Sequence, residues 1–304
     1  MGTIVLGYCM GIKAYNWIVS FFGDHSHCTK FQGTTSPFVS VNASVIQGSA
    51  LGPAAYLINA ADLNPVNKDN LMVKFADDVC LIVGSSNEHT RVEELLNVET
   101  WAENNNLKLN SAKSVEIVFE NHSKRKCSTM PPPVPNIVRH DSHKWLGVII
   151  SRTFRMREHI DSVLASCQKT LFALKTLRAH GMSTESLHRV YEAVALGKIR
   201  YASSAWFGFT SSDDRDRIDT FLRKSTRFGF LPQDHPTFSA LCERADLRLF
   251  NSILSEPNHV LRPLLPPVVS RTYNLRRRAH NFALPERTSA LSDKNFFIRM
   301  LYTT

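Results

Sequence analysis

A proline-rich segment between residues 121 and 141 separates two parts of this 304-residue chain that differ in hydrophobic periodicity. Proline has no backbone N–H and its ring clashes with the preceding helical turn, so Pro131, Pro132, Pro133 and Pro135 exclude a helix there. Before this segment, β-prone runs alternate with short helical patterns, whereas helical spacing dominates after it. The predicted fold class is therefore α+β, with a mixed part followed by an all-α part.

The part before the prolines contains elements that suit an antiparallel sheet covered on one side by helices. In chain order we expect a helix over 12–22, an alternating strand with a turn over 34–45, a buried helix that opens near Ser49 and reaches Asn59, a hairpin of 71–75 and 79–83, a helix over 88–103, and strands at 107–109 and 115–119. The mixed order excludes a purely helical fold for this part.

The part after the prolines begins with a short strand at 145–150 and then becomes helical. One apolar face runs from residue 156 to residue 177, and Ser183 is placed to cap the next helix. Ser211 or Ser212 caps a third helix, whose first turn is acidic, as the helix dipole favours. Short loops between such helices predict a bundle.

Adjacent carboxylates separate the two strands of the predicted hairpin. Asp77 and Asp78 follow Phe75 and Ala76 at its tip. Carboxylate oxygens held at a rigid turn can bind hard divalent cations. Aspartate is also a common residue of solvated turns, so the motif by itself leaves both interpretations open.

Charge is distributed unevenly along a chain whose net charge is +9. Residues 1–123 carry 7 Lys and Arg against 12 Asp and Glu, whereas residues 124–304 carry 29 against 15. Basic clusters lie at 124–126 and at Arg276, Arg277 and Arg278. Such a surface favours a polyanionic partner, although a solvated basic face explains the charge equally well.

Composition excludes several classes of protein. A hydrophobic content of 43% excludes a wholly disordered chain. No membrane span or secretory signal is present, so we expect an intracellular protein, in the nucleus or the cytoplasm. The cysteines are too scattered for a zinc knuckle and are expected to be reduced; they are Cys9, Cys28, Cys80, Cys127, Cys167 and Cys242.

Four short motifs occur in an order that resembles the palm of non-LTR (LINE-type) retrotransposon reverse transcriptases. They are Gln47-Gly48-Ser49 before a helix, Phe75-Ala76-Asp77-Asp78 in the hairpin, Asn110 with Lys113, and Trp145-Leu146-Gly147. The helices after residue 156 resemble the thumb of the same family. The resemblance implies a partial polymerase palm followed by a helical thumb, and an RNA-directed DNA polymerase that acts by nucleotidyl transfer.

The resemblance also implies roles for the individual motifs. Asp77 and Asp78 would be catalytic and would bind Mg²⁺ or Mn²⁺. The partners would be an RNA template, a DNA primer and deoxynucleoside triphosphates. The template and nucleotide contacts implied are Gln47, Gly48, Ser49, Phe75 and Lys113, and the implied primer grip is Trp145, Leu146 and Gly147.

One element of the family pattern is missing. A second metal-binding carboxylate would lie on a strand before the Gln47 helix, but Asp24 is the sole acidic residue among residues 1–61. The basic fingers region is missing as well. We therefore expect an N-terminally truncated fragment that has no polymerase activity alone.

The predicted domains are a partial palm over 1–122, a proline-rich linker over 123–143, a primer-grip strand and thumb over 144–231, and a basic region over 232–304 with no assigned fold. Two alternatives to the polymerase stay open. One is a noncatalytic nucleic-acid-binding remnant that uses the basic second half, including Arg276, Arg277 and Arg278. The other is a degenerate product without a role. The sequence indicates no oligomeric state.

Overall fold

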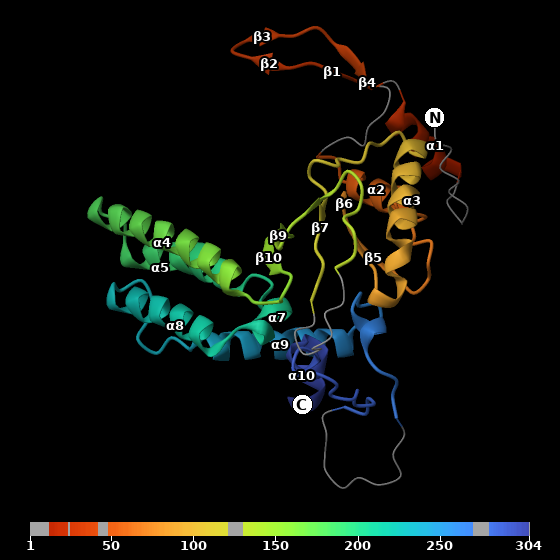
Figure 1. The fold of residues 1–304 in the computed structure, drawn as a ribbon. Coiled ribbons are helices and arrows are strands. Elements are labelled where there is room, and N and C mark those ends of the chain that lie inside the picture. The colour runs from red at the N-terminus through yellow and green to blue at the C-terminus, as the bar shows by residue number, and fades with distance from the viewer. Residues whose placement is uncertain (1–11, 24, 42–47, 121–129, 270–279, 304) are drawn as a thin grey trace. The chain divides into compact units, whose positions relative to one another are not determined.

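A computed structural model describes residues 12–23, 25–41, 48–120, 130–269 and 280–303 (Figure 1). The chain divides into two compact units, which are considered separately. Unit 1 comprises Met1–Glu116 and Thr129–Val138, and unit 2 comprises Ile117–Ser128 and Arg139–Thr304. The α+β fold class is confirmed by helices and short antiparallel strand pairs. The four predicted domains and their boundaries stay predictions.

Unit 1 begins with a helix and a long hairpin. The elements are α1 (Ile12–Phe22), β1 (His25–His27), β2 (Lys30–Phe31), β3 (Thr34–Thr35) and β4 (Val39–Val41). β1 pairs with β4 and β2 with β3, both antiparallel. The helix predicted over 12–22 is confirmed. The strand expected over 34–45 is confirmed at β3 and β4, while residues 42–45 lie outside the described part.

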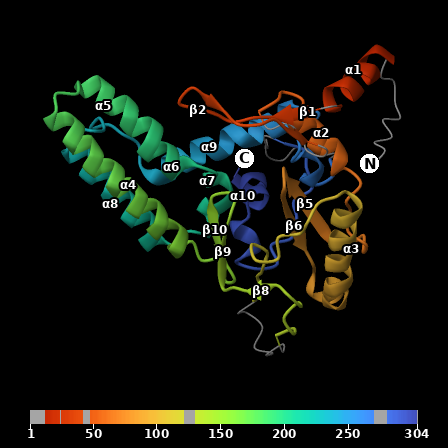
Figure 2. The ribbon, with the colours of Figure 1, turned by 90° about the horizontal axis from the view of Figure 1, so that it is seen from above.

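The remainder of unit 1 surrounds a second hairpin. The elements are α2 (Gly52–Asn59), β5 (Leu71–Phe75), β6 (Asp78–Ile82), a 3₁₀ helix (Ser85–Thr90), α3 (Arg91–Asn104), β7 (Val115–Glu116) and β8 (Val138–Arg139). β5 pairs with β6, and β7 with β8. Figure 2 shows α2 and α3 beside the β5–β6 hairpin. The predicted hairpin is confirmed.

A buried carboxylate connects α3 to the loop before β5. Glu94 is fully buried, and its two oxygens accept hydrogen bonds from the N–H groups of Val66 and Asn67, at 2.9 and 2.8 Å. The amide of buried Asn70 donates to Glu94 and to Thr90, at 2.9 Å each. Burial raises the pKa of Glu94, but these hydrogen bonds outweigh it and leave the pKa below its ordinary value.

Unit 2 opens with the hairpin of β9 (Ser142–Trp145) and β10 (Val148–Ser151), followed by helices. These are α4 (Arg157–Ala179), α5 (Thr184–Tyr191), α6 (Gly197–Arg200), α7 (Ser203–Trp206), α8 (Ser212–Arg227), α9 (Phe238–Ser255) and α10 (Phe296–Thr303). Residues Glu192–Leu196 form a π-helical segment between α5 and α6. Ser183 and Ser211 are the N-caps of α5 and α8, as the sequence predicts.

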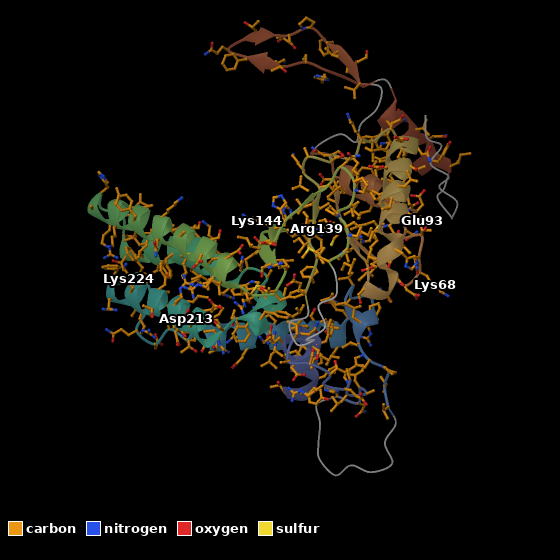
Figure 3. The ribbon with its side chains drawn as sticks, in the orientation of Figure 1. Lys68, Glu93, Arg139, Lys144, Asp213 and Lys224 are labelled. Atoms are coloured by element: carbon orange, nitrogen blue, oxygen red, sulfur yellow. The ribbon has the colours of Figure 1, made fainter. Side chains whose placement is uncertain are left out.

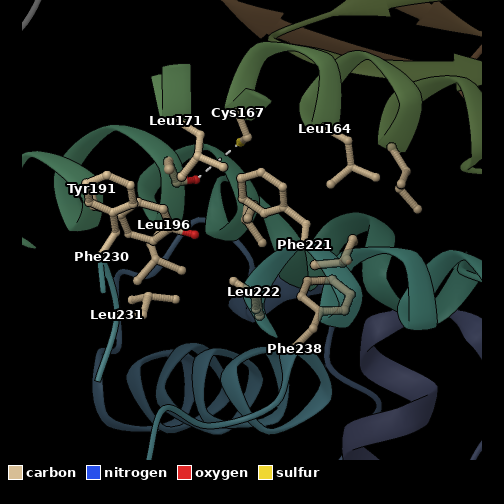
Figure 4. Close-up of a cluster of buried hydrophobic side chains, with 14 of the residues drawn as sticks. Leu164, Cys167, Leu171, Tyr191, Leu196, Phe221, Leu222, Phe230, Leu231 and Phe238 are labelled. Carbon is tan, nitrogen blue, oxygen red and sulfur yellow. Dashed lines mark hydrogen bonds between the residues drawn. The ribbon is translucent and has the colours of Figure 1, made fainter. Parts of the chain in front are cut away.

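Helices α4 to α8 and the start of α9 enclose a continuous apolar core (Figure 4), and a second, smaller cluster joins α9 to α10 through Phe250, Met300 and Leu301. Ile160, Leu187, Ile199, Ile218 and Phe230 have no exposed surface. Burying side chains of this size stabilises the fold by roughly 1.5–3 kcal/mol each. The predicted helical bundle is thereby confirmed for α4, α5 and α8.

The C-terminal helix α10 packs on α9 through an ion pair. Arg299 lies 2.6 Å from Asp246, whose side chain is 2% exposed. Arg299 also donates to the carbonyl oxygen of Lys294 at 3.2 Å. Gly208 lies directly under this segment, where a Cβ would collide with the Lys294 carbonyl. Residues 232–304 therefore contain helices where the sequence assigned no fold.

Four local predictions are wrong. The strand predicted over 115–119 ends at Glu116. Residues 107–109 form no strand, because the Leu107 N–H donates to the Ala102 carbonyl and completes the end of α3. The strand predicted at 145–150 is part of a two-stranded hairpin. The helix α2 is not buried throughout, since Leu57 and Ile58 are 61% and 50% exposed.

Candidate functional site

The acidic turn lies at the tip of the β5–β6 hairpin. Phe75 pairs with Asp78, which leaves Ala76 and Asp77 as a two-residue turn. Ala76 adopts a φ of +50°, a left-handed conformation that costs free energy for a residue with a Cβ. Phe75, Asp77 and Asp78 are all exposed. The turn therefore presents both carboxylates to solvent, on a backbone fixed by the strand pairing behind them.

Helix α2 supports the hairpin from one side. The Lys74 ammonium on β5 donates to the carbonyl oxygens of Ala60 and Leu63, at 2.7 Å each, and ties the strand to the end of α2. Burial, and then the negative charge of Asp77, raise the pKa of Tyr56 on α2. The α2 helix and the acidic turn are thus close enough to interact electrostatically.

The Gln47-Gly48-Ser49 motif lies immediately before α2. Gly48 has a φ of +85°, a conformation that favours glycine, and Ser49 accepts a hydrogen bond from the Gly52 N–H at 2.9 Å. Gln47 lies outside the described residues. The motif therefore helps to begin α2, which is the helix beside Asp77.

Lys113 follows a turn built on Asn110. The Asn110 carbonyl accepts hydrogen bonds from the N–H groups of Lys113 and Ser114, at 3.0 Å each. The Lys113 side chain is exposed and makes no ion pair with any described residue. It is available to a phosphate, but no described contact joins it to Asp77.

The Trp145-Leu146-Gly147 motif forms the turn of the β9–β10 hairpin. Leu146 and Gly147 have φ values of +45° and +85°, so both turn residues are left-handed. The Tyr201 hydroxyl donates to the Leu146 carbonyl at 3.0 Å, and a Cβ on Gly147 would lie 3.0 Å from the Tyr201 ring. This hairpin belongs to unit 2, so its predicted grip on a primer stays a prediction.

Sequence reasoning missed the residues that hold the acidic hairpin in place. Lys74 and Glu94 were not predicted to have a role, yet each satisfies several backbone groups beside β5. A cluster of asparagines before the strand was the available signal, since Asn67 and Asn70 favour turns that need a buried acceptor.

The carboxylates fit a divalent cation in kind but not in number. Aspartate oxygens are the hard ligands that Mg²⁺ and Mn²⁺ prefer. Within the described residues, however, no group of three His, Cys, Asp or Glu side chains could hold a metal ion. Asp77 and Asp78 are thus suitable ligands in kind, and their predicted role in binding a metal stays a prediction.

Several other predictions concern residues outside the site. Arg276, Arg277 and Arg278 lie outside the described residues, as do Cys9 and Cys127. The described cysteines are free, as expected; these are Cys28, Cys80, Cys167 and Cys242. No helix in the described ranges has the length and hydrophobicity needed to cross a bilayer.

Comparison with known proteins agrees with the motifs. Residues 8–150 match the family described as reverse transcriptase (RNA-dependent DNA polymerase). The chain is 28% identical over 228 residues to the RNA-directed DNA polymerase from mobile element jockey of Drosophila melanogaster, a match that covers 71% of this chain and 25% of that protein. It is 24% identical over 231 residues to the probable RNA-directed DNA polymerase from transposon X-element of the same species, covering 70% and 24%.

The chain thus spans about a quarter of the length of these curated relatives. No solved structure matches it. The family match includes the acidic hairpin and ends at β10, and the similarity to the relatives continues beyond the matched residues. Residues 8–150 therefore belong to the reverse transcriptase family, and the chain is related to the RNA-directed DNA polymerases of non-LTR mobile elements.

Proposed function

We propose that this chain carries the acidic palm hairpin and the thumb of an RNA-directed DNA polymerase from a mobile element. The exposed Asp77–Asp78 turn carries the proposal, because its strand pairing and its contacts with α2 fix it within the region that matches reverse transcriptases. In the reaction, the 3′ oxygen of a DNA primer attacks the α-phosphate of a deoxynucleoside triphosphate, and pyrophosphate leaves. The sequence of the RNA template selects the nucleotide.

Asp77 would hold a divalent cation, Mg²⁺ or Mn²⁺, with Asp78 as a supporting neighbour. When bound, the cation would stabilise negative charge on the oxygens that attack and leave. The ammonium of Lys113, which is free of ion pairs to described residues, would bind nucleotide phosphates. The Ser49 turn and Phe75 would contact template and nucleotide, and the Leu146–Gly147 turn would hold the primer end.

We also propose that the polypeptide does not extend a primer by itself. Two well-separated carboxylates are needed to bridge a pair of cations, and Asp24 is the only acidic residue in the first 61. Asp77 and Asp78 alone repel one another without a second bridging ligand. The protein would act inside cells, where its template is found.

A primer-extension assay tests the incomplete site. The isolated chain, an oligodeoxynucleotide primer on an RNA template, and Mg²⁺ or Mn²⁺ should give no extended product. Reproducible extension that disappears in Asp77→Ala would show that the site is complete, and would contradict this part of the proposal.

A hairpin graft tests the role of the turn itself. Residues 71–82 replace the corresponding hairpin of an active relative, and the graft should still extend primers. Asp77→Asn in the graft should lower the rate on the order of a thousandfold, since several kcal/mol of charge stabilisation are lost. Asp78→Asn removes the same charge one residue away and should have a smaller effect. If the Asp77→Asn graft works as well as the unmodified graft, the turn has no metal-binding role.

A noncatalytic function in binding nucleic acid is the second candidate. It is favoured by the charge of residues 124–304, which carry 29 Lys and Arg against 15 Asp and Glu. Binding that weakens steeply as salt increases would support it, because phosphate contacts release counterions.

A further inference from the structure

Helices α4 and α8 of unit 2 run parallel and in register. Arg157 pairs with Asp213 and Asp161 pairs with Arg217, so the partners are 56 residues apart in both cases. A groove of about 600 Å³ follows this shared face from Asp161 to Lys224. Three aspartates line its beginning, where both helices start.

A second hollow, of about 220 Å³, lies toward the other end of the same helix pair. It is lined by Gln168, Leu171, Phe172, Lys175 and Lys224, and we call it the α4–α8 end pocket. Its described walls contain lysines and no carboxylate. Figure 3 shows Asp213 and Lys224 toward opposite ends of α8. Two of the three aspartates at the start of this face are paired with arginines, whereas the described walls of the end pocket are cationic.

Further cations surround the end pocket. Arg178 and Arg227 lie one helical turn beyond Lys175 and Lys224, and none of the four makes an ion pair with a described residue. The Lys175 ammonium lies 3.6 Å from the centre of the Phe228 ring, which limits its movement. The C-terminal dipoles of both helices favour cations here. The positive charge that results is not neutralised by a neighbouring carboxylate.

Phe172 supplies the apolar part of this surface. It is 73% exposed, whereas the next most exposed large apolar side chain on the described α-helices of unit 2 is Leu247 at 44%. Phe172 makes no ring contact with another described aromatic residue. Most of this flat ring is thus open to solvent in a pocket that two lysines also line.

We propose that the α4–α8 end pocket binds a single-stranded polynucleotide. One base stacks on Phe172, and the phosphates on either side contact Lys175 and Lys224. Aromatic stacking together with cationic phosphate contacts is how single strands are bound without sequence preference. In a duplex the bases are already stacked on their neighbours and cannot reach the ring. The proposal builds on the proposed function, because a polymerase must hold a polynucleotide.

The test measures binding by the full chain, not nucleotide incorporation. Fluorescence anisotropy follows labelled oligoadenylate RNA, the DNA of the same sequence, and a blunt duplex. Phe172→Ala should weaken single-strand binding about tenfold. Phe172→Leu should show most of the same loss, because leucine has no π-face on which a base can stack. Leu247→Ala, which removes an exposed apolar side chain from α9, is the matched control and should have no effect.

The lysines are tested by the dependence of affinity on salt. Lys175→Gln and Lys224→Gln should each reduce the slope of log affinity against log salt by about 0.7. Lys294→Gln removes an exposed charge from a distant segment and should leave the slope unchanged. A fluorescent adenine analogue in the oligonucleotide should be quenched on binding, and Phe172→Ala should abolish the quenching.

Binding of either the RNA or the DNA strand supports the site, and the tighter of the two identifies its ligand. Equal affinity for the duplex, or no effect of Phe172→Ala, would overturn the proposal. The proposal would also be overturned if an acidic peptide displaced the bound strand at the same concentration as an unlabelled oligonucleotide does. Because the assay needs no catalysis, its failure and failure of the polymerase proposal can be told apart.

Discussion

Unit 1 buries few apolar side chains, whereas unit 2 has a continuous core. Among the described residues, the buried apolar residues of unit 1 are Ala60, Leu63, Ala102 and Val134, and all other buried apolar residues belong to unit 2. The β5–β6 hairpin of unit 1 leaves Leu71, Val73 and Phe75 exposed along one strand. Such a hairpin is marginal unless something else restrains it.

Hydrogen bonds to buried polar groups take the place of a core in unit 1. Glu94 satisfies the backbone before β5, and Lys74 satisfies the backbone after α2. These contacts are directional and local, so they set the position of the acidic turn but protect little apolar surface from water. The candidate catalytic turn therefore lies in the unit that we expect to open first.

The largest effect is expected from the core of unit 2. Leu174→Ala, at a side chain that is 1% exposed, should lower the free energy of unfolding by about 3 kcal/mol through lost burial and a cavity. Urea unfolding of the full chain, followed by far-UV circular dichroism, measures it. Leu177→Ala on the same helix is the control, since Leu177 is 37% exposed. Equal losses in both variants would show that unit 2 has no dominant core.

A smaller effect is expected in unit 1. Glu94→Gln should cost about 2 kcal/mol, because the backbone donors keep a weaker acceptor and face a new amide donor. Amide hydrogen exchange should show lost protection at Val66 and Asn67, with α4 unchanged. Glu93→Gln alters the exposed neighbour and should leave both amides protected. If Glu94→Gln leaves both amides protected as well, the buried network does not hold the hairpin.

Acid should produce the smallest effect, and should reach the two units at different pH values. Burial, and then the charge of Lys144, lower the pKa of His159 below 6.5. In the unfolded chain His159 takes up a proton near pH 6.5, whereas in the folded chain it stays neutral at that pH. The free energy of unfolding therefore falls as the pH drops below 6.5. The contribution of Glu94, whose pKa is lowered, is lost only below about pH 4.5.

Urea titrations of unit 2 between pH 7 and pH 5 measure the first loss. His159→Gln, which cannot gain a proton, should show a weaker dependence on pH in this range. The protection factor of the Val66 amide, corrected for the intrinsic exchange rate at each pH, should stay constant over the same range and fall in stronger acid. If both units lost stability together near pH 6, the prediction that they respond to acid at different pH values would be wrong.

Local signals predicted much of this fold. The N-caps of α5 and α8 could be predicted, because a serine side chain accepts a hydrogen bond from a backbone N–H only three residues further along the chain. The hairpin around Asp77 could be predicted because two β-prone runs flank a short polar turn. The motif residues were located, but their roles stay predictions.

Features that depend on residues far apart in the sequence could not be predicted from local patterns. Helix α9 was missed, although Thr237 caps it, because nearby prolines obscured its apolar spacing. The carboxylate of Glu94 binds backbone groups 27 and 28 residues away, which no local pattern records. Phe172 falls in a helix that the sequence predicted, yet its exposure depends on where α8 lies.

The contact between Arg299 and Asp246 makes the integrity of unit 2 depend on a residue more than fifty positions further along the chain. Translation that stopped short of position 299 would leave a carboxylate enclosed among apolar helices without its counter-charge, which costs about 3–5 kcal/mol. A shortened copy of this sequence would therefore have a unit 2 that is prone to unfolding and proteolysis.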